Sequence, residues 1–269
     1  MKIACLQLDI AFGNPAENKR RMQRELEQIC DQQLDVIVLP ELWTTGYDLP
    51  NLQTIADEDG KDTKSFISEL AQLYNVNIVA GSVAKKTKTS ITNTMYVANR
   101  TGDIVGEYSK LHLFRLMDEH LYLQSGDETG FFTLDDTLCA GVICYDIRFP
   151  EWIRAHTVQG ATVLFVVAEW PLPRLSHWRT LLQARAIENQ CYVVACNRAG
   201  TDPNNVFAGH SLIIDPWGNI VAEAGEKPCS LIGEIDLTKV NEVRSQIPIF
   251  QDRRLAAYTK AEKIFKKMY

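Results

Sequence analysis

The sequence lacks the features of a membrane, secreted or nucleic-acid-binding protein. No window approaches the roughly 18 apolar residues of a membrane-spanning helix. The first ten residues, MKIACLQLDI, lack the apolar core and small-residue cleavage site of a signal peptide. There are 34 acidic and 28 basic residues, a formal net charge of −6, with no long run of one sign. Because nucleic-acid binders usually carry a basic stripe, we expect neither a nucleic acid nor a membrane as a partner.

The seven cysteines are odd in number and form no C-x-x-C motif, which favours a reducing, cytoplasmic compartment over a disulfide framework. Two pairs have C-x4-C spacing, Cys139 with Cys144 and Cys191 with Cys196. Each pair lies in or beside a strand-like run, where a separation of five puts the side chains on opposite faces. We therefore expect no zinc site and interpret most of the cysteines as small buried side chains.

Linkers, repeats and low-complexity segments are also missing from the 269 residues. We expect a single domain over residues 1–269, of which about 251–269 form a C-terminal tail. The end of this tail, KAEKIFKKMY, is locally basic, and we interpret it as a solvated helix face.

What the sequence does contain is an alternation of β-branched apolar runs with helix-like segments. The main expected strands are residues 2–10, 35–41, 76–84, 137–146 and 161–170, and the main expected helices are residues 18–30, 62–74 and 176–190. Helices cannot cover both faces of so many strands in one sheet. The pattern therefore predicts an α/β fold: a four-layer α-β-β-α sandwich of two mixed sheets with helices outside.

Three expected strands end on a reactive side chain: Glu41, Lys110 and Cys144. Reactive groups of α/β proteins gather at such strand ends. Glu119, in the loop after Lys110, is a fourth candidate. A thiol such as Cys144 needs a base, because only a few per cent of it is thiolate near neutral pH.

Glu41 is the candidate base, since a carboxylate in an apolar pocket rises in pKa toward a useful value. Lys110 supplies a positive charge that favours the thiolate and can stabilise an oxyanion, with the backbone N–H of Tyr145 as a second donor. Each residue also has a structural interpretation: Cys144 as a core thiol, Lys110 as a solvated strand end, and Glu41 as a cap of the next turn. A Cys–His pair using His112 or His120 is a further alternative.

The stretches VLPELWTTGYD, KLHLF and ICYDIRFPEW resemble, in order and spacing, the three signature regions of the nitrilase superfamily of carbon–nitrogen hydrolases. The resemblance covers nearly the whole chain. It implies a catalytic triad of Glu41, Lys110 and Cys144, with Glu119 as the second glutamate that contacts the lysine and helps to orient substrate. It also implies an α-β-β-α sandwich that forms a homodimer or a higher homo-oligomer, without a metal or an organic cofactor.

Within the superfamily, LPELWTTGYDL, LMDEHLYL, AEWPLPRLSHW and ARAIENQ resemble the omega-amidase branch, and in particular amidases encoded with bacterial methionine-salvage enzymes. This resemblance implies hydrolysis of the omega-amide of 2-oxoglutaramate, through a thioester, to 2-oxoglutarate and ammonia. The alternatives are an amidase for N-carbamoyl amines or N-carbamoyl amino acids, a true nitrilase, and a non-catalytic metabolite-binding protein.

A small anionic amide needs a cation for its carboxylate. Arg148 lies four residues after Cys144, and a guanidinium there could clamp a carboxylate through two hydrogen bonds. The alternative is that Arg148 pairs with Glu151 or with a backbone carbonyl. Further candidates to line the pocket are Tyr47, Trp170 and His177, although aromatic side chains in such loops are as often packing residues. We expect the 2-oxo acid amide to be preferred over glutamine, on the premise that no spare carboxylate receives the ammonium of glutamine.

Overall fold

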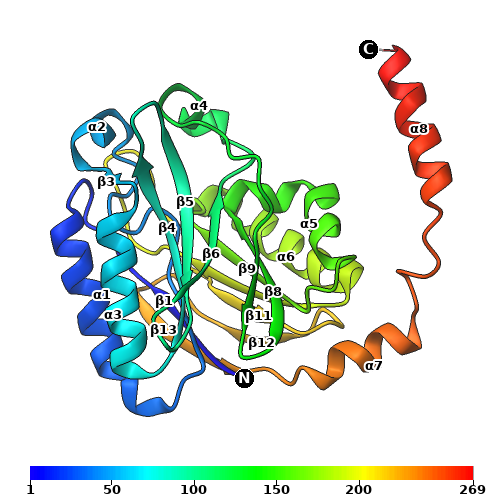
Figure 1. Cartoon of the computed structure of the whole chain (residues 1–269), viewed down its shortest axis with the longest axis horizontal. Coiled ribbons are helices and arrows are strands. Elements are labelled where there is room, and N and C mark those ends of the chain that lie inside the picture. Colours follow the sequence, from blue (N-terminus) through cyan, green and yellow to red (C-terminus); the bar gives the residue numbers. More distant parts are fainter. Residues whose placement is uncertain (269) are drawn as a thin grey trace.

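The computed structural model describes residues 1–268, with side chains described for residues 1–261 (Figure 1). Within these residues the strands form two sheets. The first sheet contains β1 (Lys2–Gln7), β2 (Val36–Val38), β3 (Asp57–Glu58), β4 (Asn77–Lys86), β5 (Ile91–Ala98), β6 (Ile104–Ser109) and β13 (Cys229–Glu234). The second contains β7 (Phe131–Leu134), β8 (Thr137–Ile143), β9 (Val163–Ala168), β10 (Tyr192–Asn197), β11 (Leu212–Ile214) and β12 (Ile220–Glu223).

Each sheet has a parallel centre and antiparallel edges. The strand orders are β13-β1-β2-β4-β5-β6, with β3 beside β4, and β12-β11-β10-β9-β8-β7. Strands β1, β2 and β4 run parallel, as do β8, β9 and β10. Parallel neighbours bring their carboxyl ends to one edge of the sheet, which is where α/β proteins place their functional loops.

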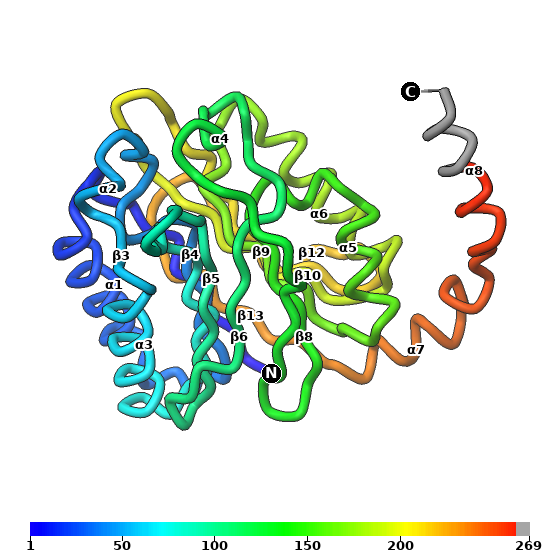
Figure 2. Tube along the Cα trace, turned by 45° about the horizontal axis from the view of Figure 1, so that its top comes forward, coloured from blue at the N-terminus to red at the C-terminus, as the bar shows by residue number. Residues whose placement is uncertain are grey.

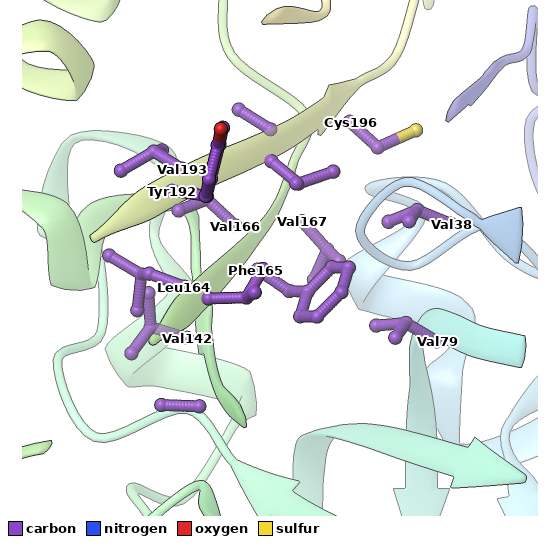
Figure 3. Close-up of a cluster of buried hydrophobic side chains, with 14 of the residues drawn as sticks. Val38, Val79, Val142, Leu164, Phe165, Val166, Val167, Tyr192, Val193 and Cys196 are labelled. Atoms are coloured by element: carbon purple, nitrogen blue, oxygen red, sulfur yellow. The ribbon is translucent and has the colours of Figure 1, made fainter. Parts of the chain in front are cut away.

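The core between the sheets consists of apolar side chains from alternate strand positions. Val38 and Val79 of the first sheet share this core with Val142 and Phe165 of the second. Figure 3 shows the Phe165 ring extending from β9 toward Val38 and Val79. Strands β8–β10 are buried on both faces, which explains their continuous apolar sequence.

Helices cover the outer face of each sheet, so the prediction of a four-layer sandwich is confirmed. Helices α1 (Pro15–Ile29) and α3 (Lys61–Tyr74) lie on the first sheet, and α5 (Pro150–Thr157) and α6 (Leu175–Asn189) on the second (Figure 1). Helix α1 begins at a proline after Asn14, whose side chain accepts a hydrogen bond from the Glu17 N–H at 3.1 Å. It then buries Met22, Leu26 and Ile29 at helical spacing.

The C-terminal part of the chain leaves the sandwich. Helix α7 (Thr238–Gln246) runs along its edge, and α8 (Leu255–Met268) stands apart from both sheets in two views (Figures 1 and 2). The side chains of most of KAEKIFKKMY lie outside the described residues, so the interpretation of this stretch as a solvated helix face stays a prediction. Of the helices in the described part of the chain, none is both long enough and apolar enough to cross a membrane.

Candidate active site

Cys144 lies where β8 gives way to the 3-10 turn Cys144–Arg148. Its φ is +47°, in the left-handed region, and the residue is buried. A non-glycine residue in this region costs free energy and persists only when its surroundings enforce it. Here the Asp146 carboxylate accepts the Ile143 N–H at 3.0 Å and so closes the turn around Cys144.

Asp146 also ties this turn to the segment that carries Lys110. It accepts hydrogen bonds from the Tyr108 hydroxyl at 2.8 Å and from the His112 N–H at 3.0 Å, and its Oδ1 lies 2.8 Å from His112 Nδ1. The His112 ring stacks on Phe149 with 3.6 Å between the ring centres. His112 therefore supports the turn through Asp146, while His120 is exposed on the short helix α4 (Glu119–Tyr122).

Two carboxylates hold the Lys110 ammonium in the interior. Lys110 Nζ lies 2.8 Å from Glu41 Oε1 and 2.6 Å from Glu119 Oε1, and all three side chains are fully buried. Glu119 is the first residue of α4, not a loop residue as the sequence suggested. The segment that carries Glu119 is attached to the end of β6, because the Gly126 N–H donates to the Lys110 carbonyl at 2.9 Å.

Further donors fix both carboxylates. Glu41 Oε1 accepts from Asn93 Nδ2 at 2.8 Å, and Glu41 Oε2 accepts from the Glu169 N–H at 2.9 Å. The Tyr47 hydroxyl lies 2.6 Å from Glu119 Oε1 and 3.1 Å from Glu41 Oε1. Glu119 Oε2 accepts from the Phe114 N–H at 2.7 Å, so every oxygen of the two carboxylates has at least one donor that fixes its position.

The electrostatics of the site keep the resting thiol protonated. Burial raises the pKa of Cys144 well above its usual value, and the Glu41 charge adds to this while Lys110 opposes it. Burial disfavours the charged form of Lys110, but Glu119 and Glu41 outweigh it and raise its pKa. Burial also raises the pKa of Glu119, against the effect of Lys110. Attack by the sulfur therefore requires transfer of its proton to a neighbouring base.

A small cavity opens on the thiol, lined by Phe114, Met117, Cys144, Tyr145, Arg148, Glu169, Trp170, Pro171 and Arg174. Of the residues expected to bind substrate, Arg148 and Trp170 line this cavity. Tyr47 instead faces the two carboxylates, and His177 is exposed, with its Nδ1 3.3 Å from Arg148 Nη2. The Arg148 guanidinium lies 4.8 Å from the centre of the Trp170 ring.

The cavity has a second cation that sequence reasoning missed. Arg174 lines it from the end of the 3-10 turn Leu172–Arg174, with its guanidinium 5.5 Å from the Phe114 ring centre. Among the residues with described side chains, neither Arg148 nor Arg174 has a carboxylate within ion-pair distance, Glu151 included. Burial lowers the pKa of Arg148, and the Arg174 charge lowers it further. Two unpaired guanidinium groups at one cavity suit an anion.

Sequence reasoning also missed Glu169, which directly follows β9 and lines the same cavity. Its Oε2 lies 2.7 Å from Arg198 Nη1, and both side chains are fully buried. Burial raises the pKa of Glu169 to about 8, although Arg198 opposes this. A third carboxyl therefore lines the pocket, but it is paired with Arg198 and is not a spare carboxylate. Among the described residues no group of three or more His, Cys, Asp or Glu side chains is arranged to hold a metal ion.

Comparison with protein families matches residues 2–245 to the carbon–nitrogen hydrolase family. The chain is 56% identical over 256 residues to a 2-oxoglutaramate amidase of Bacillus subtilis, covering 95% of this chain and 98% of that protein. It is 36% identical over 254 residues to an omega-amidase of Escherichia coli, covering 94% and 96% of the two chains.

Solved structures agree with this match. A CN-hydrolase superfamily protein of Xanthomonas campestris superimposes with a TM-score of 0.89 at 31% identity, covering 94% of this chain and 97% of that one. Nit3 of Saccharomyces cerevisiae, a member of the nitrilase superfamily, gives a TM-score of 0.86 at 26% identity, covering 92% and 94%.

Proposed function

Because the chain belongs to the carbon–nitrogen hydrolase family, we propose that it hydrolyses the omega-amide of 2-oxoglutaramate to 2-oxoglutarate and ammonia. The reaction type rests on the buried Lys110 between Glu41 and Glu119, next to a thiol held in the left-handed conformation. The substrate rests on the similarity to a 2-oxoglutaramate amidase and on the two unpaired arginines of the cavity.

In the first half of the reaction, the Cys144 sulfur attacks the amide carbon and Glu41 takes the thiol proton. The negative charge that forms on the carbonyl oxygen is stabilised by Lys110 Nζ and by the Tyr145 N–H. Glu41 then returns the proton to the amide nitrogen, the carbon–nitrogen bond breaks, and ammonia leaves. The acyl group remains on Cys144 as a thioester.

In the second half, a water molecule attacks the thioester carbon while Glu41 takes its proton. The same two donors stabilise the second oxyanion, which collapses and expels the sulfur. The carboxylic acid leaves and Cys144 recovers its proton from Glu41. Glu119 binds no reacting atom in this scheme. Its contacts with Lys110 and Tyr47 keep the ammonium aimed at the oxyanion.

Arg148 and Arg174 receive the carboxylate at the other end of the substrate. The pair repels a cation, so the ammonium of glutamine is unfavourable in this cavity where the 2-oxo group is not. Glu169 does not offset this repulsion, because its charge is shared with Arg198. We therefore still expect glutamine to be a poor substrate.

We expect kcat/KM for 2-oxoglutaramate to exceed that for glutamine by more than roughly a hundredfold, because a poorly paired cation costs several kcal/mol. The measurement is ammonia release over a panel of 2-oxoglutaramate, 2-oxosuccinamate, glutamine, carbamoylputrescine and simple nitriles. Equal rates on glutamine and 2-oxoglutaramate would refute the substrate and leave the amidase chemistry intact. Release of carbon dioxide with ammonia would identify a carbamoyl substrate instead.

The Arg148→Lys variant tests the carboxylate clamp within the same experiment. A lysine keeps the charge but cannot form two parallel hydrogen bonds to a carboxylate, so turnover of 2-oxoglutaramate should fall. An amide without a carboxylate serves as the matched control, and its turnover should change little. A variant as active as the parent on 2-oxoglutaramate would show that another residue binds the carboxylate.

We also propose that the protein is a cytoplasmic homodimer. In the monomer α8 stands apart from the sandwich, with Leu255 and Tyr258 about half exposed, and a second copy would cover them. Light scattering should give twice the mass of the chain, and a monomer would contradict the proposal. Seven cysteines without a disulfide among the described residues favour a reducing compartment. A place among methionine-salvage enzymes stays a prediction.

A further inference from the structure

Glu169 has a buried oxygen that nothing in the described structure satisfies. Its Oε2 accepts from Arg198, whose Nη2 in turn donates to the carbonyls of Ile10 at 2.8 Å and Thr201 at 3.0 Å. Its Oε1 is fully buried and has no hydrogen-bond partner among the described residues. A buried polar oxygen without a hydrogen-bond partner costs free energy, and native proteins rarely keep one without a reason.

The position of Glu169 points to a ligand. The residue lines the cavity that opens on Cys144, and its own N–H holds Glu41, the proposed base. The ion pair with Arg198 needs only one carboxyl oxygen. Arg198 Nε also lacks a hydrogen-bond partner among the described residues, so the pair itself supplies no donor to the second oxygen of this cavity-lining carboxyl.

The chemistry of the proposed substrate narrows what Oε1 can bind. The carboxylate, the 2-oxo group and the amide carbonyl of 2-oxoglutaramate only accept hydrogen bonds. The amide nitrogen is its one donor, with two N–H groups. The carboxylate end is drawn to Arg148 and Arg174, and the carbonyl oxygen to Lys110. The amide nitrogen is left for the carboxyl groups of the cavity.

We infer that Glu169 Oε1 accepts a hydrogen bond from the amide nitrogen of the substrate and so selects an unsubstituted amide as the leaving group. This inference rests on the proposed amidase function. The bond strengthens as the nitrogen takes a proton from Glu41 and gains positive charge, so it acts mainly on carbon–nitrogen bond cleavage. Burial raises the pKa of Glu169 to about 8 in the free protein, and an N–H donor at Oε1 favours the ionised carboxylate in the complex.

The test compares two substrates that form the same thioester but differ in the leaving group: 2-oxoglutaramate and the 5-methyl ester of 2-oxoglutarate. In the Glu169→Gln variant, Arg198 orients the side-chain oxygen toward itself, which turns the NH2 group toward the substrate nitrogen. A donor then faces a donor. We expect kcat/KM for the amide to fall by about a hundredfold and that for the ester by less than about threefold.

The matched control is Glu223→Gln, which removes another carboxylate paired with an arginine, Arg179 at 2.8 Å, away from the cavity. Its ratio of amide to ester turnover should equal that of the parent. If Glu169→Gln does not fold, Glu169→Asp serves instead. It keeps the negative charge for Arg198, and its side chain, one methylene shorter, moves the free oxygen away from the substrate. The same selective loss on the amide is expected. Equal losses on both substrates, or no loss on the amide, would overturn the inference.

The same pair of substrates separates this inference from the proposed function. If the parent enzyme does not act on 2-oxoglutaramate, the substrate assignment fails, and propionamide with methyl propionate replaces the pair. A selective loss on propionamide in Glu169→Gln would still support Glu169 as the residue that binds the leaving group. Unselective loss there would reject it independently of the natural substrate.

Discussion

The Cys144→Ala variant is expected to fold normally and to lose ammonia release by about ten-thousandfold or more, because no other group can form the acyl intermediate. Cys144→Ser should be nearly as poor, since a hydroxyl is a much weaker nucleophile at this pH. Initial rates on 2-oxoglutaramate, with thermal melting to verify the fold, provide the measurement. More than about a hundredth of the parent rate in Cys144→Ala would exclude covalent catalysis at this residue.

Cys139 offers the matched control for this prediction. It lies on β8, five residues before Cys144, is fully buried, and has a pKa raised to about 12, chiefly by burial. Cys139→Ala should therefore keep nearly full kcat. Mass spectrometry under conditions that slow the attack of water should find the acyl group on Cys144 alone. An adduct on Cys139 or Cys191 would contradict the assignment.

The sequence predicted the two-sheet sandwich and the strand ends that Lys110 and Cys144 directly follow, whereas β2 ends at Val38, three residues before Glu41. These predictions depend on local patterns: apolar runs that end on a polar residue. They could not reveal that Tyr47 turns its hydroxyl toward Glu119, since that contact joins residues 72 positions apart in the chain. Local patterns also could not reveal the contacts of Asp146 with Tyr108 and His112, which lie more than 30 residues earlier in the chain.

The sequence does contain a pattern that predicts the ion pair between Glu169 and Arg198. Both directly follow buried strands, β9 and β10, and these strands are parallel neighbours in which Asn197 pairs with Ala168. Residues that follow paired positions at the carboxyl ends of parallel strands lie side by side. The segments VVAE and ACNR therefore predict the ion pair, provided that β9 and β10 are known to be neighbours. Periodicity along the chain does not determine strand order.

The Glu41→Gln variant is expected to lower kcat by about a thousandfold to ten-thousandfold, because Glu41 is the base in both halves of the reaction. The substitution keeps the shape of the side chain. A glutamine has only one acceptor oxygen, however, and cannot serve both Lys110 and the Glu169 N–H. Single-turnover experiments should find formation and hydrolysis of the thioester both slowed, since each needs a proton taken by residue 41.

In the same Glu41→Gln variant the rate of Cys144 alkylation should rise while the rate of hydrolysis falls. This difference distinguishes loss of the base from damage to the site. The Glu41 charge raises the pKa of Cys144 and the Lys110 charge lowers it. Removing the first and keeping the second lowers the pKa, so alkylation of Cys144 should become faster at neutral pH while hydrolysis slows. Glu107→Gln, which removes the surface partner of Lys85 at 2.6 Å, should change neither rate. Slower alkylation in Glu41→Gln would indicate a collapsed site, and a loss of kcat below about tenfold would assign the base to another residue.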